Sequence, residues 1–310
     1  MRAYVGVTDK EWFQMLASMP GLEEINFWQP SGKHTFRALN PGELFLFKLH
    51  SPDNYIVGGG LFAYSTLLPV SLAWDSFQKA NGADSLAQMR ARIAKYRRSD
   101  DPYLDYSIGC ILLSQPFFLP RSQWIAVPKD WSLNIVQGKT YDLKSELGAS
   151  LFQDLQRAQL LSSTERLRTA QPTPREKERF GKPVLVPPRL GQGTFRVIVT
   201  DAYQRRCAVT QEKVLPVLEA AHIKPYSAGG EHRLNNGLLL RSDLHLLFDR
   251  GYVTVTKNFH LEVSKRIREE FENGRDYYAL QGKEIWTPSE DPKRPDTTNL
   301  EWHNENVFRG

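Results

Sequence analysis

The chain has 310 residues, and at about 100–200 residues per domain this length predicts two domains or one large one. Hydrophobic residues make up 41% of it and charged residues 24%, a balance typical of globular proteins. No run reaches the about 18–20 apolar residues of a membrane span, and the first residues lack a signal-peptide core. Only two cysteines are present, Cys110 and Cys207, which disfavours a disulfide framework. We therefore expect a protein of the reducing cytoplasm with no membrane partner.

Positive charge is concentrated in one segment. The net charge is +5 and the isoelectric point is about 9.1, values that nucleic-acid-binding proteins share with many that bind none. Residues 157–213 contain twelve Lys and Arg against five Asp and Glu, a net +7, so the rest of the chain carries −2. Because this excess lies directly before and within the motif described below, it favours contact with a polyanion; a solvated linker is the alternative.

Residues 1–145 have the pattern of a mixed domain rich in strands. The expected elements, in chain order, are strands at 42–49 and 54–64, helices at 72–81 and 85–98, and strands at 108–113 and 124–127. A turn signal between the first two strands predicts a hairpin. Three glycines at 58–60 predict a bulge or a close approach of another backbone.

Residues 146–193 are expected to connect this domain to a second one. Leucines at near-helical spacing predict a helix over 146–168, and the next segment, 171–193, has five prolines in 23 residues, as linkers do. The second domain is expected at 194–310. Its expected elements are a helix from 195, an apolar run at 215–223, a helix from 242 and a pair of strands within 252–264. The fold class is therefore α+β.

The most informative stretch is 218–255, where three polar side chains recur at fixed spacing. His222 begins a His-Ile-x-Pro run, Asn236 follows 14 residues later, and His245 follows after a further 9, on the expected helix. Phosphodiester hydrolysis needs an activated water, and a neutral imidazole is a good base near pH 7. It also needs charge stabilisation, which a divalent cation supplies. A hairpin carrying the base beside a short helix carrying a metal ligand would provide both.

This pattern resembles the HNH, or ββα-metal, nuclease superfamily, and within it the branch fused to bacterial restriction-type proteins. The resemblance covers about 194–310. It implies that His222 is the general base and that His245 is a ligand of a divalent metal ion, Mg²⁺ or Mn²⁺ or another transition metal. Asn236 is expected either to brace the loop that orients His222 or to touch the metal. Asn-Asn-Gly turn chemistry is the structural alternative for Asn236.

One departure from the HNH pattern affects the metal site. Many HNH enzymes carry a metal-binding Asp or His directly before the base, where this chain has Ala221. Glu219 lies two residues earlier, and residues two apart in a strand point to the same face, so Glu219 is the first candidate for the missing ligand. Asp243 and Asp249 are the other candidates. A surface ion pair is the alternative role for Glu219.

The remaining polar residues of the motif have weaker assignments. The lone Cys207 gives no support for a structural zinc site, and His232 is expected to be a loop residue, with phosphate contact as the alternative. Four basic residues near the motif are expected to contact the DNA backbone; the alternative for each is a solvated surface charge without a specific contact. They are Lys224, Arg233, Arg241 and Arg250.

The order of strands and helices in 1–145 resembles the PUA-like barrel group, which includes the EVE, ASCH and SRA domains. The resemblance implies a PUA-like β-barrel with helical insertions and a pocket that accepts a flipped, modified base between aromatic walls. Trp28, Tyr64 and Trp74 are the first candidates for these walls, and core packing is the alternative for each. A basic run could meet phosphates or form an exposed helix face. It comprises Arg90, Arg92, Lys95, Arg97 and Arg98.

Three functions fit these residues. The first is a modification-dependent endonuclease that cuts double-stranded DNA near a modified base such as methyl- or hydroxymethyl-cytosine. The second is a nuclease activated by a small nucleotide signal. The third, suggested by Ala221, is a nucleic-acid-binding protein with a degenerate nuclease module. A single HNH module cuts one strand, so cutting both strands predicts a homodimer or two sequential events.

Overall fold

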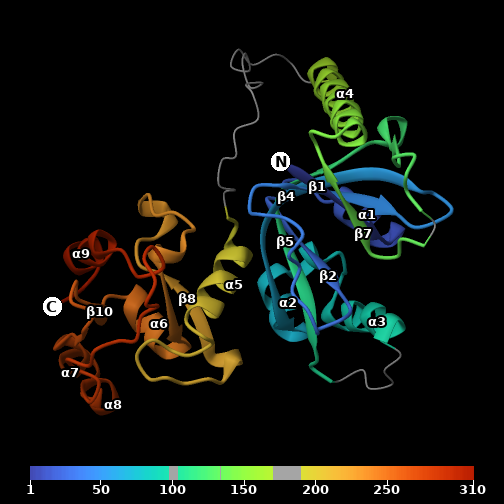
Figure 1. Cartoon of the computed structure of the whole chain (residues 1–310). Coiled ribbons are helices and arrows are strands. Elements are labelled where there is room, and N and C mark those ends of the chain that lie inside the picture. Colours follow the sequence, from blue (N-terminus) through green and yellow to red (C-terminus); the bar gives the residue numbers. More distant parts are fainter. Residues whose placement is uncertain (98–103, 133, 170–189) are drawn as a thin grey trace. The chain divides into compact units, whose positions relative to one another are not determined.

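A computed structural model describes residues 1–97, 104–132, 134–169 and 190–310 (Figure 1). Contacts divide the chain into two units, Met1–Arg189 and Leu190–Gly310, and each is described by itself. Arg98 and residues 170–189, which hold most of the expected proline-rich linker, lie outside the described residues. Within the described part, no helix is both long enough and apolar enough to cross a membrane.

The first unit is built on one mixed sheet. Its strands are β1 (Arg2–Thr8), β2 (Glu24–Gln29), β3 (Leu44–Leu49), β4 (Tyr55–Pro69), β5 (Ser107–Phe118), β6 (Ile125–Ala126) and β7 (Gly138–Asp142). Its helices are α1 (Lys10–Ala17), α2 (Val70–Phe77), α3 (Leu86–Arg97) and α4 (Glu146–Thr169). The order across the sheet is β2–β5–β4–β3–β1–β7, with β6 paired to β4. β3 and β4 form the hairpin that the sequence predicts.

The expected barrel is not closed among the described residues. Closure would require β2 and β7, the two ends of the strand order, to pair with each other, but β2 pairs with β5 and β7 pairs with β1. Residues of both edges line a cavity instead, Trp28 from β2 and Gln137 directly before β7 among them. The α+β class is confirmed, whereas the closed barrel is corrected to an open sheet with a cavity at its seam.

The three consecutive glycines of β4 allow neighbouring strands to approach closely. A Cβ atom added at Gly58 would lie 2.3 Å from the carbonyl oxygen of Phe117, and one at Gly59 would lie 2.6 Å from that of Phe45. The register of β4 against β5 also shifts between Gly59 and Leu61. The bulge and the close backbone approach that the sequence predicts are thus both present.

Helix α4 packs on the first unit. Leu151, Leu155 and Ala158 are buried in one cluster with Ala3 and Val5 of β1. The helix contacts β6 and β7, which Figure 1 shows beside it. Helix α4, which the sequence analysis assigned to the connecting segment 146–193, therefore packs its apolar face on the first unit.

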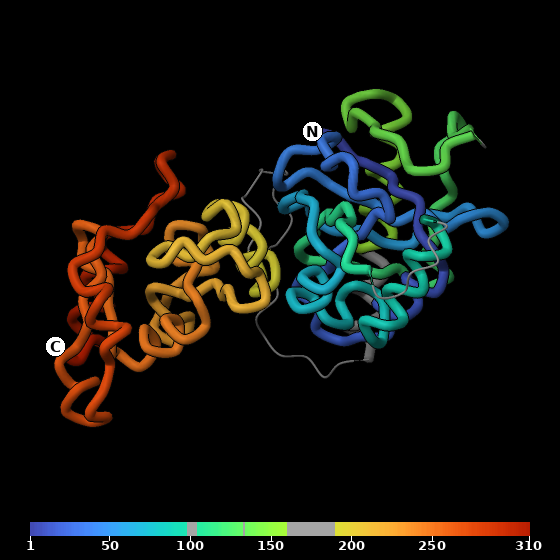
Figure 2. The backbone as a smooth tube through the Cα atoms, turned by 90° about the horizontal axis from the view of Figure 1, so that it is seen from below, coloured from blue at the N-terminus to red at the C-terminus, as the bar shows by residue number. Residues whose placement is uncertain are grey.

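The second unit contains a ββα arrangement. Its elements are α5 (Gln192–Ala202), β8 (Leu218–His222), β9 (Gly237–Arg241), α6 (Ser242–Asp249), β10 (Val253–Val255), β11 (Leu261–Val263), α7 (Arg266–Phe271), α8 (Arg275–Tyr278) and α9 (Thr297–Asn306). β8 and β9 form an antiparallel hairpin, and α6 packs against both strands. In Figure 2 the later elements, orange to red, lie on one side of the yellow α5–β8 segment. The expected strand pair within 252–264 is β10 and β11.

Candidate active site

Hairpin β8–β9 and helix α5 together position His222. His222 is the last residue of β8 and pairs with Gly237 at the start of β9. A Cβ at Gly237 would lie 2.5 Å from Cγ2 of Val199 and 3.0 Å from Cζ of Phe195, so this glycine allows α5 to lie directly on the hairpin. The Phe195 ring stacks on the His222 imidazole with centroids 3.9 Å apart and an interplanar angle of 11°. The ring of His222 is therefore fixed by packing before any substrate binds.

The surroundings of His222 favour its neutral form. Desolvation is the main cause that lowers the pKa of His222 to about 4, and the nearby His232 and His245 contribute to the same shift. Because a base must be unprotonated to accept a proton, this shift keeps the imidazole available at neutral pH. The structure thus gives the predicted base the charge state that the role requires.

His232 lies against His222. Its Nδ1 atom is 2.9 Å from Nε2 of His222, and the Tyr226 ring stacks on the other side of His232. The sequence indicated a loop residue at this position and gave no sign of the contact. A second histidine ten residues after the first, in a loop that returns to the same strand pair, was the available signal.

Asn236 braces the loop between the two strands. Its side-chain amide donates to the carbonyl oxygens of Lys224 and Glu231, and its oxygen accepts from the Lys224 backbone N–H, each at 2.9 Å. The side chain is only 2% exposed. Of the two roles expected for Asn236, these contacts support bracing, because its polar atoms are occupied by loop backbone.

Helix α6 brings His245 between two carboxylates. The Nδ1 atom of His245 lies 2.6 Å from Oε2 of Glu219 on β8, and its Nε2 lies 3.3 Å from Oδ2 of Asp249, one helical turn along. Desolvation raises the pKa of Asp249, the nearby His245 opposes this shift, and the negative charge of Glu219 adds to it. The two acids therefore repel each other across the ring, and a cation beside them would relieve that repulsion.

These side chains could hold a divalent cation. No group of three or more His, Cys, Asp or Glu side chains converges on a single point among the described residues. Glu219 and His245 nevertheless offer one oxygen and one nitrogen, and Mg²⁺ commonly uses one or two protein ligands and takes the rest from water and phosphate. Asp249 approaches the opposite nitrogen, where carboxylates orient metal-binding histidines. Asp243 is committed elsewhere, since it holds Arg241 through two contacts of 2.7 Å.

A cleft of about 520 Å³ joins the base to these carboxylates. His222, Glu219, His245 and Asp249 all line it. Helix α5 adds Arg196 to the lining, a cation that the sequence analysis did not single out. The cleft thus brings together a basic side chain, an imidazole and carboxylates, which are kinds of group that phosphodiester hydrolysis can use.

Residues 207–256 match a protein-family model described as HNH endonuclease. The second unit carries an HNH endonuclease domain. The match spans the hairpin and helix that hold His222, Asn236 and His245, and it confirms the HNH-type endonuclease that the sequence resembles.

Two solved structures are similar to the chain at low TM-scores. ASCH from Zymomonas mobilis has a TM-score of 0.35 and 9% identity, and the match covers 49% of this chain and 94% of that one. A modification-dependent restriction endonuclease, TagI, has a TM-score of 0.28 and 14% identity, covering 93% of this chain and 76% of that one. No curated protein sequence matches the chain.

The four predicted DNA-binding cations of the HNH unit have different surroundings. Lys224 lies over the Trp302 ring, 5.3 Å from its centroid. Arg233 is exposed and pairs with Glu231, whereas Arg241 is held by Asp243. Arg250 is exposed and is the C-cap residue of α6, the helix that carries His245. Arg233 and Arg250 are therefore the more accessible to a phosphate backbone.

The basic residues of α3 are engaged within the first unit. Arg97 donates to the carbonyl oxygens of Pro30 and Ser107 and lies over the Tyr106 ring. Arg92 pairs with Glu11 at 3.3 Å. These contacts favour a structural role for both arginines over the phosphate contacts considered for the run.

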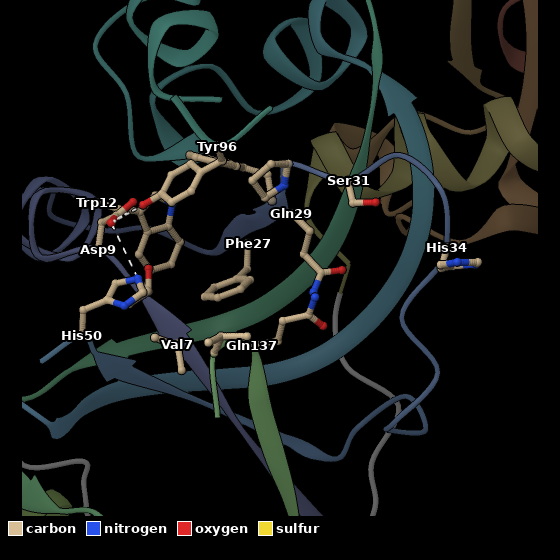
Figure 3. Close-up of a pocket in the computed structure, with 14 residues that line it drawn as sticks. Val7, Asp9, Trp12, Phe27, Gln29, Ser31, His34, His50, Tyr96 and Gln137 are labelled. Carbon is tan, nitrogen blue, oxygen red and sulfur yellow. Dashed lines mark hydrogen bonds and ion pairs between the residues drawn. The ribbon is translucent and has the colours of Figure 1, made fainter. Parts of the chain in front are cut away.

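The cavity at the open seam of the first unit has a volume of about 300 Å³ (Figure 3). Trp28 lines it, but Tyr64 on β4 and Trp74 on α2 are not among its lining residues. The structure therefore does not gather the three predicted aromatic residues around this cavity. Trp12, Phe27 and Tyr96, which the sequence did not single out, supply the other aromatic surface.

A polar cluster occupies one end of the same cavity. Asp9 accepts a hydrogen bond from the Tyr96 hydroxyl at 2.7 Å, and His50 lies 3.9 Å from the same carboxylate oxygen. Figure 3 shows this cluster on one side of Phe27 and the amides of Gln29 and Gln137 on the other. The cavity thus combines flat apolar surface with hydrogen-bonding groups at its ends.

Proposed function

We propose that the protein is a modification-dependent DNA endonuclease in which His222 is the general base. The nuclease part of this proposal rests on one observation: His222, which is stacked on Phe195 and favours its neutral form, lies in one cleft with Glu219 and His245. The family match supports the reaction class. DNA as the substrate agrees with the basic charge of residues 157–213.

In the proposed reaction, His222 removes a proton from a water molecule positioned in the cleft. The water oxygen forms a bond to phosphorus as the bond to the leaving oxygen breaks, and that oxygen is then protonated from solvent. Asn236 keeps the loop in the conformation that fixes His222. Arg196 lines the cleft, where its positive charge favours the developing negative charge on the phosphoryl group.

Glu219 and His245 are the proposed metal-binding residues. Their two donor atoms lie 2.6 Å apart, and Asp249 orients the ring from its other nitrogen. A divalent cation bound there would stabilise negative charge on the phosphoryl oxygens. Glu219 thereby takes the place of the ligand that many HNH enzymes carry at the position of Ala221.

The seam cavity is the proposed site that recognises the modified base. Its aromatic surface and polar ends suit a flat ring with hydrogen-bonding edges, and its volume lies at the small end of ligand pockets. Neither Lys nor Arg is among its lining residues in the described part of the chain. A phosphate-bearing nucleotide signal would need such cations, so the cavity favours a flipped base whose phosphates stay outside.

Cleavage of two otherwise identical plasmids, one with and one without modified cytosines, tests this function in the presence of Mg²⁺ or Mn²⁺. We expect the modified plasmid to be cut at least about 10-fold faster, since discrimination of one small group in a pocket is worth about 1–3 kcal/mol. Equal cutting of both plasmids would contradict modification dependence. Normal DNA binding without cutting under any of these conditions would support a degenerate nuclease instead.

A further inference from the structure

We propose that His232 is a positioning residue that fixes the tautomer of His222 and so selects Nδ1 as the atom that accepts the proton. This inference rests on the proposed role of His222 as the base. Its foundation is the 2.9 Å contact between Nε2 of His222 and Nδ1 of His232. No metal ligand or substrate group is needed for this contact to form.

The contact links the tautomers of the two rings. A hydrogen bond between two neutral imidazoles requires one nitrogen to carry the hydrogen and the other to lack it. When Nε2 of His222 donates to Nδ1 of His232, Nδ1 of His222 has a free lone pair and can act as a base. In the opposite arrangement, Nδ1 of His222 would carry a hydrogen and could not accept a proton from water. Only the first arrangement is active.

Packing holds both rings in the geometry that this bond needs. Phe195 stacks on His222 with centroids 3.9 Å apart, and Tyr226 stacks on His232 with centroids 5.2 Å apart, each at an interplanar angle of 11°. The two imidazoles meet edge to face at 62°. Each imidazole thus has its own aromatic support, one from α5 and one from the loop after β8. This packing holds the two nitrogens at hydrogen-bonding distance without the help of a carboxylate.

The same contact stabilises His222 after it has accepted the proton. The proton passes from the water oxygen to Nδ1 of His222, while Nε2 keeps its hydrogen and continues to donate to His232. The imidazolium is a stronger donor than the neutral ring, so the bond strengthens as the charge forms. In this step His232 only accepts the hydrogen bond through Nδ1 and keeps its own hydrogen on Nε2. Proton number is conserved, and no further reactant is required.

Two substitutions at His232 separate the hydrogen bond from the ring stack. His232→Phe keeps an aromatic ring beside Tyr226 and removes the acceptor, whereas His232→Asn loses the ring but places an oxygen acceptor near the position of Nδ1. His260→Phe is the matched control, because His260 is an exposed histidine outside the cleft. All variants are compared as full chains, in plasmid cleavage with Mg²⁺ or Mn²⁺.

We expect His232→Phe to lower kcat by about 100-fold or more with KM nearly unchanged, because a wrongly oriented base loses most of its general-base contribution. His232→Asn is expected to recover at least about one tenth of wild-type kcat, and His260→Phe to match the wild type. On a His222→Ala background, His232→Phe should cause no further loss, because the two residues act as a unit.

A His232→Phe variant with wild-type kcat would overturn the inference, and so would equal losses of kcat in His232→Phe and His232→Asn. A rise in KM without a change in kcat would also overturn it, because it would indicate a phosphate contact. A nitrogen-15 NMR measurement on the unsubstituted protein tests the tautomer without any variant: hydrogen on Nε2 of His222 is expected, and hydrogen on Nδ1 contradicts the inference. His222→Ala separates the two proposals. Wild-type cleavage by that variant would remove the proposed base, whereas its inactivity combined with an active His232→Phe would remove only the role of His232.

Discussion

The depressed pKa of His222 has a direct consequence for the pH dependence of cleavage. Because burial and two neighbouring histidines lower this pKa to about 4, the imidazole stays unprotonated well below neutral pH. At saturating metal ion, we expect the cleavage rate to change little between pH 7 and pH 5 and to fall as the pH approaches 4. A rate that falls with a midpoint near 6.5, the ordinary histidine value, would show that His222 is not shielded in this way.

Asn236 offers a second test at the residue scale. Asn236→Ala removes three hydrogen bonds to loop backbone and leaves part-buried backbone groups of Lys224 and Glu231 without these partners. We expect a loss of about 1–3 kcal/mol in stability and a lower kcat, because the loop no longer holds His222. Asn235→Ala, one residue earlier, is the control and should have a small effect on both. The measurements are urea unfolding and plasmid cleavage.

The spacing of the motif was sufficient to predict that His222 and His245 share a cleft, and the period of a strand was sufficient to place Glu219 beside His245. The stacking of Phe195 on His222 could not be predicted from the sequence, because it depends on how α5 packs on the hairpin. The contact with His232 was also missed, because loop geometry sets it. Both depend on tertiary packing, which has no periodic signature in the chain.

At the scale of elements, α9 secures α6 through one buried histidine. His303 is 2% exposed, stacks on Phe248 and makes hydrogen-bonding contacts with Thr254 and the Phe248 carbonyl. Desolvation lowers the pKa of His303 to about 4, although its contact with the Phe248 carbonyl opposes this shift. Helix α6 is therefore secured by a contact that favours the neutral ring.

Because His303 is buried in its neutral form, we predict that the free energy of unfolding decreases in mild acid. Between pH 6.5 and pH 4 the unfolded chain binds a proton at His303 and the folded chain does not, so stability declines as the pH falls through this window. For this group we expect a loss of about 2 kcal/mol between pH 6.5 and pH 5. Urea unfolding of the wild type and of His303→Phe measures it. An identical pH dependence in both proteins would contradict the role given to His303.

Several elements of both units were predictable because their apolar patterns are regular. The β3–β4 hairpin, the bulge at the glycines and α4 follow from periodicity and turn residues, whereas the ββα order follows from the resemblance to HNH nucleases. No element was predicted for residues 1–41, where β1, α1 and β2 lie. The open seam did not follow, because closure of a barrel depends on whether two distant edges pair. For the same reason the sequence could not predict that Trp12 of α1 lines the seam cavity. It also could not predict that Tyr64 and Trp74 are not among the lining residues.

At the scale of the whole molecule, each chain carries one HNH cleft in its described part. One cleft cuts one strand at a time, so we expect supercoiled plasmid to become open circles before it becomes linear. The linear product should form faster at higher protein concentration if two chains act together. Gel analysis of the products and light scattering on DNA measure this. Linear product without an open-circular intermediate, at a concentration where the protein is monomeric, would contradict the account.

The central claim is tested most directly by the cleavage rate of His222→Ala on plasmid DNA that the wild type cuts, with Mg²⁺ or Mn²⁺ present. We expect the rate to fall by about 1000-fold, because removal of a general base costs about 100- to 10,000-fold, while DNA affinity and unfolding free energy stay close to those of the wild type. A His222→Ala protein that cuts at the wild-type rate would contradict the account.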